Sequence, residues 1–306
     1  MTKSEDRPRR LVHFTPLRYP GGKGKLAAYV KSLILANDLS DGCYVEPYAG
    51  GAGIALELLM QEYVSRIFIN DVSVLVHAFW SAALNETDAL CQLIVDTPRT
   101  VEAWDRQKTV LMNAKSHSTL EVGFATFFLN RTNRSGILNG GIIGGRDQSG
   151  PWKIDARYNA PELVARIEAI ANLASRIVIS NDDAADFIAS GANRWPSRTL
   201  VYLDPPYYVK GRELYYDFYR HEDHLDIARI VQEKLKIQKW IVSYDNVPEI
   251  RSLYSDRRRT IYDIGYSARA TKKGSEVMFF CDHMNISPLV GAVHATEEAN
   301  LERLSA

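Results

Sequence analysis

The sequence has no long hydrophobic run, few cysteines and no excess of charge of either sign. A membrane-spanning helix needs about 18 to 20 consecutive apolar residues, and no such stretch occurs among the 306 residues. The first ten residues are polar and basic, without the apolar centre of a secretory signal. These absences predict a cytoplasmic protein that does not associate with membranes.

Composition also gives no sign of a metal site or of bulk electrostatic binding. Cys43, Cys91 and Cys281 are far apart and lack the paired spacing of zinc ligands, so we expect reduced, buried thiols and no bound metal. Lys and Arg total 37 and Asp and Glu total 37, which gives zero net charge. This balance argues against a protein that coats nucleic acid through bulk charge, but it leaves room for local basic patches.

The most informative stretch is a strand that runs into two prolines. Residues 200–203 are typical of a buried strand, and Asp204, Pro205, Pro206 and Tyr207 follow directly. Because the prolines fix φ and lack amide hydrogens, the Asp204 carboxylate and the Pro205 carbonyl are left as rigid acceptors beside the Tyr207 ring. Two acceptors and a stacking face can hold the exocyclic amino group of a planar base. The alternative is a tight turn with a half-exposed tyrosine, since short motifs match freely.

Two glycine-rich loops precede predicted helices. The first, residues 21–23 (Gly-Gly-Lys), does not have the spacing of a Walker loop, because Leu17 and Gly24 occupy two of the required positions. A nucleoside triphosphate site is therefore not indicated. By itself this segment is equally consistent with a ligand-binding loop and with a turn that begins a helix.

The second loop, residues 47–53, joins a predicted strand over 43–46 to a predicted helix over 54–62. Strand, glycine-rich turn and helix form the start of the ligand site in doubly wound folds. Leu56 stands where the dinucleotide fingerprint needs its third glycine, so a smaller cofactor is favoured. Asp71 ends the next predicted strand, at the position from which an acid reaches ribose hydroxyls, although it could equally cap the following helix.

Hydrophobic spacing predicts an α/β domain with a helical insertion. The chain is 46% hydrophobic and long enough for both parts. Residues 73–133 carry helical spacing without an intervening strand, which interrupts the alternation of strands and helices. The alternation returns after residue 161, with later strands expected over 176–180, 239–245, 260–266 and 276–281.

Two irregular basic stretches are candidates for contact with nucleic acid. The first covers residues 131–158, and loops of this length are usually functional or disordered. Its candidate residues, suited to phosphate and base-edge contacts, are Arg131, Asn133, Arg134, Lys153 and Arg157. The second, residues 267–275 with Lys272 and Lys273, is expected to face a polyanion. A solvated loop or turn is the alternative for both stretches.

In this order, the motifs resemble those of the Dam-like (alpha class) DNA adenine N6-methyltransferases. The resemblance runs from about residue 17 to residue 282 and rests on six segments, which are residues 19–23, 45–51, 70–71, 128–131, 179–182 and 204–207. It implies a Rossmann-like class I methyltransferase sheet with helices on both faces. The catalytic domain would comprise residues 14–72 and 175–283. Residues 73–174 would form a mainly helical target-recognition subdomain with a β-hairpin at about 131–158. Residues 1–13 and 284–306 are expected to be tails, the latter with a terminal helix as the alternative.

The resemblance also implies roles for individual residues. In this family the segment that matches residues 19–23 lies against the methionine part of S-adenosylmethionine, and the acid that matches Asp71 binds the ribose. The implied cofactor-binding residues are Tyr19, Lys23, Glu46, Pro47, Tyr48, Gly50, Gly51, Asp71, Asn181, Asp182 and Asp204. The implied catalytic residues are Asp204, Pro205, Pro206 and Tyr207.

The implied activity is methylation of a flipped-out adenine in a short duplex DNA target. The expected partner is double-stranded DNA, with or without a cognate restriction nuclease, and the protein is expected to be a monomer or weak dimer. A cytosine C5 enzyme is excluded because none of the three cysteines follows a proline. An RNA adenine enzyme, a DNA cytosine-N4 enzyme and a non-catalytic sensor of DNA or cofactor remain as alternatives.

Overall fold

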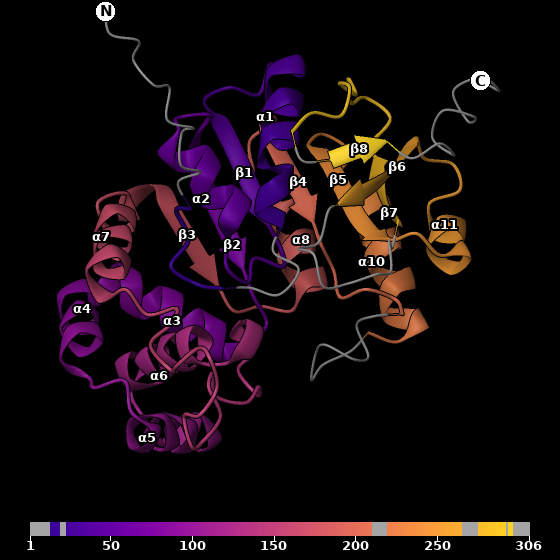
Figure 1. Ribbon diagram of the computed structural model, residues 1–306. Coiled ribbons are helices and arrows are strands. Elements are labelled where there is room, and N and C mark those ends of the chain that lie inside the picture. Colours follow the sequence, from indigo (N-terminus) through magenta and orange to yellow (C-terminus); the bar gives the residue numbers. More distant parts are fainter. Residues whose placement is uncertain (1–12, 19–22, 210–218, 265–274, 292, 296–306) are drawn as a thin grey trace, which may run out of the picture.

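The computed structural model describes residues 13–18, 23–209, 219–264, 275–291 and 293–295. The centre of the molecule is an eight-stranded sheet with the strand order β3-β2-β1-β4-β5-β7-β6-β8 (Figure 1). The strands are β1 (Gly42–Glu46), β2 (Val64–Asn70), β3 (Ile177–Ser180), β4 (Thr199–Leu203), β5 (Lys239–Asp245), β6 (Arg259–Ile264), β7 (Ser275–Phe280) and β8 (Val293–Ala295).

Strands β1 to β5 are parallel, and the later strands are antiparallel. All five residues of β1 and of β4 are buried, because these two strands lie at the middle of a sheet that is covered on both faces. Strand β7 lies between β5 and β6 and places Glu276 opposite both Asp245 and Tyr262. This sheet confirms the expected α/β, Rossmann-like methyltransferase fold.

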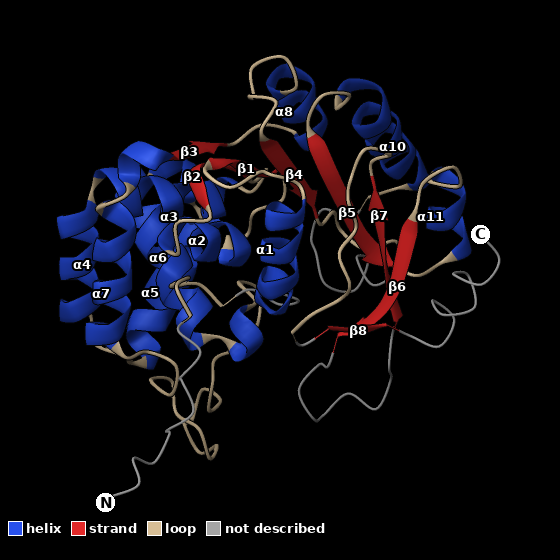
Figure 2. Cartoon of the chain, turned by 90° about the horizontal axis from the view of Figure 1, so that it is seen from above, coloured by secondary structure: helices blue, strands red, loops and turns tan. Residues whose placement is uncertain are grey.

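Helices cover both faces of the sheet, as Figure 2 shows from above. One face carries η1 (Lys23–Leu26), α1 (Ala27–Ala36) and α2 (Gly53–Met60), and the other carries α8 (Ala184–Gly191), α10 (His221–Lys234) and α11 (Pro248–Leu253). In the part of the chain that is described, no helix is long and apolar enough to span a membrane.

A group of helices between β2 and β3 lies beside the β3 end of the sheet (Figure 1). It consists of α3 (Val74–Asn85), α4 (Thr87–Asp96), α5 (Val101–Met112), α6 (Thr119–Thr132) and α7 (Ala160–Ala171), with short 3-10 turns η2 (Ala114–Ser116), η3 (Arg134–Gly136) and η4 (Ala174–Arg176). Helix α6 begins with a capping box formed by Ser118 and Glu121, and its Phe127 stacks on Phe79 of α3 at 5.9 Å between ring centroids. The helical spacing of residues 73–133 therefore reflects packing between these helices.

The β-hairpin expected within residues 131–158 is absent. All of these residues are described, and they contain a single antiparallel bridge, between Asn133 and Ile142, followed by turns. Gly144 and Gly145 have positive φ values of 87° and 80°, which break an extended strand. The prediction of a hairpin at this position is wrong.

The segment after residue 283 is also more ordered than a tail. Met284 is buried, and the backbone amide of Asn285 donates to Asn37 Oδ1 at 2.7 Å beside the end of α1. Strand β8 then pairs with β6. The expectation of a C-terminal tail or helix is thus corrected for residues 284–291 and 293–295, whereas residues 1–12 and 296–306 lie outside the described part.

Candidate active site

Asp204 lies directly after β4, at the carboxyl end of the parallel strands. Its Oδ1 accepts a hydrogen bond of 2.9 Å from Ser243 Oγ on β5. The loop after the two prolines is held by Asp245, whose oxygens accept from the backbone amides of Tyr208 and Val209 at 2.9 and 3.0 Å. Strand β5 therefore fixes the motif on both sides of the prolines.

Lys23 brings a positive charge to the same point from the start of η1. Its Nζ lies 3.6 Å from Asp204 Oδ1 and 2.7 Å from Glu276 Oε2, and it also donates to the Tyr207 hydroxyl. The Lys23 residue is 8% exposed and Glu276 is 1% exposed. Glu276 Oε2 accepts a further hydrogen bond of 3.0 Å from Tyr262. Because buried charges are costly unless paired, this ion pair fixes the Lys23 ammonium beside Asp204 and Tyr207.

The charges around Asp204 act on its protonation in opposite directions. The pKa of Asp204 is raised from 3.8 to about 6, because burial and the Glu276 carboxylate raise it more than the Lys23 ammonium lowers it. A carboxylate with this pKa is mostly ionised at pH 7 and can act as a hydrogen-bond acceptor.

Two further acids, Glu46 and Asp71, lie at the same end of the sheet. Glu46 ends β1, where its Oε1 accepts from the Tyr44 hydroxyl at 2.9 Å, and burial raises its pKa to about 8. Asp71 follows β2, and its two oxygens accept from the backbone amides of Gly50 and Ser73, both at 2.9 Å. Burial raises the pKa of Asp71 as well.

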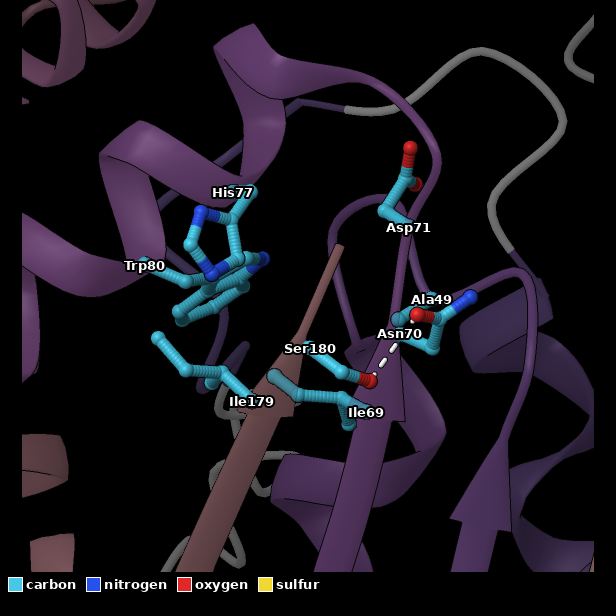
Figure 3. A pocket seen from close by; sticks show the side chains of 8 residues that line it. All are labelled: Ala49, Ile69, Asn70, Asp71, His77, Trp80, Ile179 and Ser180. Atoms are coloured by element: carbon cyan, nitrogen blue, oxygen red, sulfur yellow. Dashed lines mark hydrogen bonds between the residues drawn. The ribbon is translucent and has the colours of Figure 1, made fainter. Parts of the chain in front are cut away.

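A pocket beside Asp71 lies between the ends of β2 and β3 and helix α3 (Figure 3). The lining residues are Ala49, Ile69, Asn70, Asp71, His77, Trp80, Ile179 and Ser180. Apolar side chains and two aromatic rings with a carboxylate beside them form a surface that suits a nucleoside, because the base needs flat apolar contacts and the ribose needs acceptors for its hydroxyls. The residue types of this pocket are those expected beside the nucleoside part of S-adenosylmethionine, and their contact with it stays a prediction.

Asn70, which is 1% exposed, ties the walls of this pocket together. Its amide nitrogen donates to the carbonyls of Pro47 and Asp182, both at 3.0 Å. Its oxygen accepts from the Asp182 amide and from Ser180 Oγ, both at 2.9 Å. Nearby, Asn181 Nδ2 donates to the Asp71 carbonyl at 2.7 Å. The expected cofactor residues Pro47, Asp71, Asn181 and Asp182 are thus brought together.

The second glycine-rich loop lies beside the start of η1. Gly50 and Ala52 both have φ of 47°, and Trp80 Nε1 donates to the Gly50 carbonyl at 2.9 Å. A methyl group added at Gly53 would lie 4.0 Å from the Gly24 backbone, so the second loop touches the residue after Lys23. Gly50 and Gly51 therefore lie in a loop next to both the pocket beside Asp71 and the backbone of Gly24.

The structure does not bring every expected residue to the pocket beside Asp71. The Tyr48 hydroxyl lies 3.1 Å from that of Tyr219. Tyr19, Lys272 and Lys273 lie outside the described residues. The ammonium of Lys23 is held by the catalytic motif, and its contact with cofactor stays a prediction.

Asn133 corrects one predicted nucleic-acid contact. It is completely buried, its Nδ2 donates to the Ile137 and Leu138 carbonyls at 2.8 and 3.0 Å, and its Oδ1 accepts from Trp104 Nε1 at 2.7 Å. The side chain therefore shapes the turn after α6 and cannot reach a base. The residue type alone did not distinguish a buried asparagine that holds a turn from a surface residue that contacts nucleic acid.

The other basic candidates lie at the surface or partly exposed. Arg134, Lys153 and Arg157 are exposed, and Arg131 is half-buried with its Nε donating to the Arg157 carbonyl at 2.7 Å. Arg18, which sequence reasoning missed, donates from Nη1 to the Asn133 carbonyl at 3.1 Å. Asn130 of α6 pairs with the Arg18 backbone through two hydrogen bonds of 2.7 Å. The helical region is thereby joined to the segment that leads to Lys23.

Glu276, Ser243 and Asp245 were also missed by sequence reasoning. No local motif marks them, because each acts on a residue far away in the chain. Glu276 is separated from Lys23 by 253 positions. The one available signal was that Asp245 ends a predicted strand, as Asp71 and Asp204 do.

A family model for D12 class N6 adenine-specific DNA methyltransferases matches residues 19–268. The chain belongs to this family. Membership makes it a methyltransferase of a kind that uses S-adenosylmethionine, and the matched range contains the glycine loops, Asp71 and the Asp204 motif. No curated protein matches the sequence.

Solved structures that resemble this D12-family chain are distant in sequence. One, from Pyrococcus horikoshii, is described as a "putative RNA methyltransferase"; it is 10% identical with a TM-score of 0.40, and the match covers 86% of this chain and 84% of that one. Another, from Escherichia coli, is described as a "putative methyltransferase"; it is 10% identical with a TM-score of 0.34, over 87% of this chain and 89% of that one.

Proposed function

We propose that this chain transfers the methyl group of S-adenosylmethionine to N6 of an adenine in duplex DNA. The observation that carries the proposal is the end of β4, where Ser243 and Lys23 hold Asp204 next to the Tyr207 ring. Membership in a family described as adenine-specific and DNA-directed supports the choice of base and polymer.

The residues after β4 supply what a poor nucleophile needs. The lone pair of the adenine amino group is delocalised into the ring, so N6 must be made more electron-rich. Ionised Asp204 accepts one N–H of this group and the Pro205 carbonyl accepts the other, which favours a pyramidal nitrogen. Tyr207 stacks on the base after it leaves the duplex. S-adenosylmethionine would supply the methyl group and leave as S-adenosylhomocysteine, because the bond to sulfur breaks as the bond to N6 forms. N6 itself is the nucleophile, so no covalent enzyme intermediate is required, and the N–H proton that N6 loses would pass to solvent, directly or through Asp204.

The acids on the other side of the site hold the cofactor in this proposal. Each Asp71 oxygen accepts one backbone amide, which leaves further lone pairs for ribose hydroxyls. His77, Trp80 and Ile179 line the adjoining pocket and would contact the adenine of the cofactor. Glu46, with the Gly50 and Gly51 loop, would face the methionine part.

Four arginines support an anionic polymer as the partner. The pKa of Arg131 is lowered to about 10 by burial and by the charges of Arg18, Arg166 and Arg157, against the opposing charge of Glu162. Like charges gathered in this way favour an anion such as a DNA phosphate. The group adjoins the Arg18 backbone, which leads within five residues to Lys23.

The arginine group has a salt-dependent signature. Arg157→Gln is expected to weaken DNA binding and to reduce the slope of log K against log salt by about 0.9 for each lost phosphate contact. Arg229→Gln, on the exposed surface of α10, serves as the control and is expected to leave the slope unchanged. Equal slopes for Arg157→Gln and wild type would remove Arg157 from the DNA contact.

The deciding experiment offers the protein radiolabelled S-adenosylmethionine with either duplex DNA or structured RNA. The methylated base is then identified by mass spectrometry of the nucleosides. N6-methyladenine in DNA is the expected product. N4-methylcytosine or methylated RNA would replace the proposal by one of the related reactions. Bound cofactor with no transfer to either polymer would indicate a sensor.

A further inference from the structure

Lys23 is shared between two carboxylates that come from distant parts of the chain. Its Nζ lies 2.7 Å from Glu276 Oε2 on β7 and 3.6 Å from Asp204 Oδ1 after β4. The same ammonium donates to the Tyr207 hydroxyl. One cation thus touches both the amine acceptor and the stacking residue of the proposed base site.

The remaining groups that face Asp204 do not replace this cation. Ser243 on β5 donates a neutral hydrogen bond of 2.9 Å. The negative charge of Glu276 on β7 opposes ionisation of Asp204, and Glu46 on β1, whose pKa burial raises to about 8, brings no positive charge. The Tyr202 hydroxyl, which lies 2.8 Å from Ser243 Oγ, is neutral at physiological pH. Among the described residues that act on Asp204, Lys23 is therefore the group whose charge favours the ionised form.

We propose that Lys23 is a positioning residue that keeps Asp204 ionised and orients Tyr207, and that Glu276 limits how strongly the Lys23 charge acts on Asp204. The inference rests on the proposed function, because it assigns Asp204 the role of amine acceptor. It adds that the ionisation of this acceptor is set by a lysine and a glutamate that lie far apart in the sequence.

The two members of the pair act on Asp204 in opposite directions. Removal of the Lys23 charge leaves Asp204 beside the Glu276 carboxylate in a buried place, so protonated Asp204 persists to higher pH. Removal of the Glu276 charge takes away the carboxylate that competes with Asp204 for the Lys23 ammonium. Ionised Asp204 is then stabilised more strongly and persists to lower pH. A purely structural ion pair would lower activity in both variants without moving the pH dependence.

The test measures the pH dependence of methyl transfer by wild type, Lys23→Met and Glu276→Gln. The midpoint of the acidic limb is expected to rise by about 1 to 3 pH units in Lys23→Met and to fall in Glu276→Gln. Lys23→Arg keeps the charge and is expected to restore the midpoint toward that of wild type. Lys31→Met is the matched control, because Lys31 forms its ion pair with Glu57 on the helices α1 and α2, away from Asp204.

A second readout needs neither cofactor nor turnover. The Asp204 side-chain carbon is followed by NMR in carbon-13 aspartate-labelled protein during a pH titration, and its signal is assigned with Asp204→Asn. The same opposite shifts are expected, and they are measurable even in a variant too weak to assay. Unchanged midpoints in both folded variants would overturn the inference, whereas absence of transfer by wild type with the expected NMR shifts would overturn the proposed function alone.

Discussion

Asp71 and Asp204 lie at the carboxyl ends of strands in one sheet, but they are held in different ways. Asp71 accepts from the backbone amides of Gly50 and Ser73, which are 21 and 2 residues away. Asp204 is held by side chains, the Ser243 hydroxyl 39 residues away and the Lys23 ammonium from the other end of the catalytic region.

This difference separates binding from chemistry. The backbone amides that hold Asp71 are fixed dipoles that do not titrate, and in the proposed function this acid lies on the cofactor side. The ionisation of Asp204 depends on a lysine and a second acid, so the side that touches the reacting amine can be tuned by substitution. Four changes test this division, in order of expected effect.

The largest effect is expected for Asp204→Ala. Loss of the acceptor should lower kcat by roughly 10²- to 10³-fold or more, as for removal of one preorganised hydrogen-bonding group in other active sites. Binding of S-adenosylhomocysteine, measured by calorimetry, should change little. Asp204→Asn, which keeps the shape, controls for packing. Transfer at the wild-type rate by Asp204→Ala would refute its catalytic role.

Asp71→Ala should give the converse pattern. A hydrogen bond to a charged group contributes about 1.5 to 3 kcal/mol, so the cofactor Kd is expected to rise by roughly 10- to 100-fold. The kcat at saturating cofactor should stay close to that of wild type. Calorimetry and steady-state kinetics separate the two quantities. A fall in kcat with unchanged Kd would show that Asp71 does not belong to the cofactor side.

Asn70→Ala tests the hydrogen bonds that join the strand ends beside Asp71. The substitution removes four hydrogen bonds of a buried side chain and leaves the Pro47 and Asp182 carbonyls without this donor. The free energy of unfolding should fall by about 1 to 3 kcal/mol, with a weaker cofactor affinity. Chemical denaturation measures the first effect. The acidic limb of the pH profile of methyl transfer should not move. A shift would show that the Asp71 side and the Asp204 side of the site are energetically coupled.

The smallest effect is expected for Glu46→Gln, in the pH dependence of stability. Burial raises the pKa of Glu46 to about 8 in the folded protein, above the ordinary value of 4.5. Wild type therefore has its full stability from this group below pH 4.5 and loses it as pH rises toward 8. Between pH 6 and pH 7, wild type should lose at most about 1.4 kcal/mol that Glu46→Gln keeps. Parallel stability curves for both proteins would contradict a raised pKa.

Local sequence patterns predicted much of the site. Strand β4 with Asp204, strand β2 with Asp71 and the loop after β1 were all expected from short apolar runs that end in an acid or in glycines. Such runs specify structure locally, because buried parallel strands need apolar side chains and tight turns need glycine. The range that the family model matches contains all of these motifs.

Predictions failed where a residue's role depends on what packs against it. Asn133 is of a residue type that often contacts nucleic acid, but its side chain is buried, where it bonds two backbone carbonyls of a turn and the Trp104 indole. The expected hairpin is replaced by one bridge and turns, and Asn133, at that bridge, bonds the Ile137 and Leu138 carbonyls of the turn that follows.

The sequence by itself determined the α/β fold, the helical insertion and the positions of Asp71 and Asp204 after their strands, because these features are specified by short stretches with their own periodicity. Only the tertiary structure decided that Lys23 meets Asp204 and Glu276, that Asn70 joins three strand ends, and that Asn133 is buried. The reason is physical: hydrogen bonds and ion pairs act over a few ångströms, and the sheet order brings residues 253 positions apart into that range.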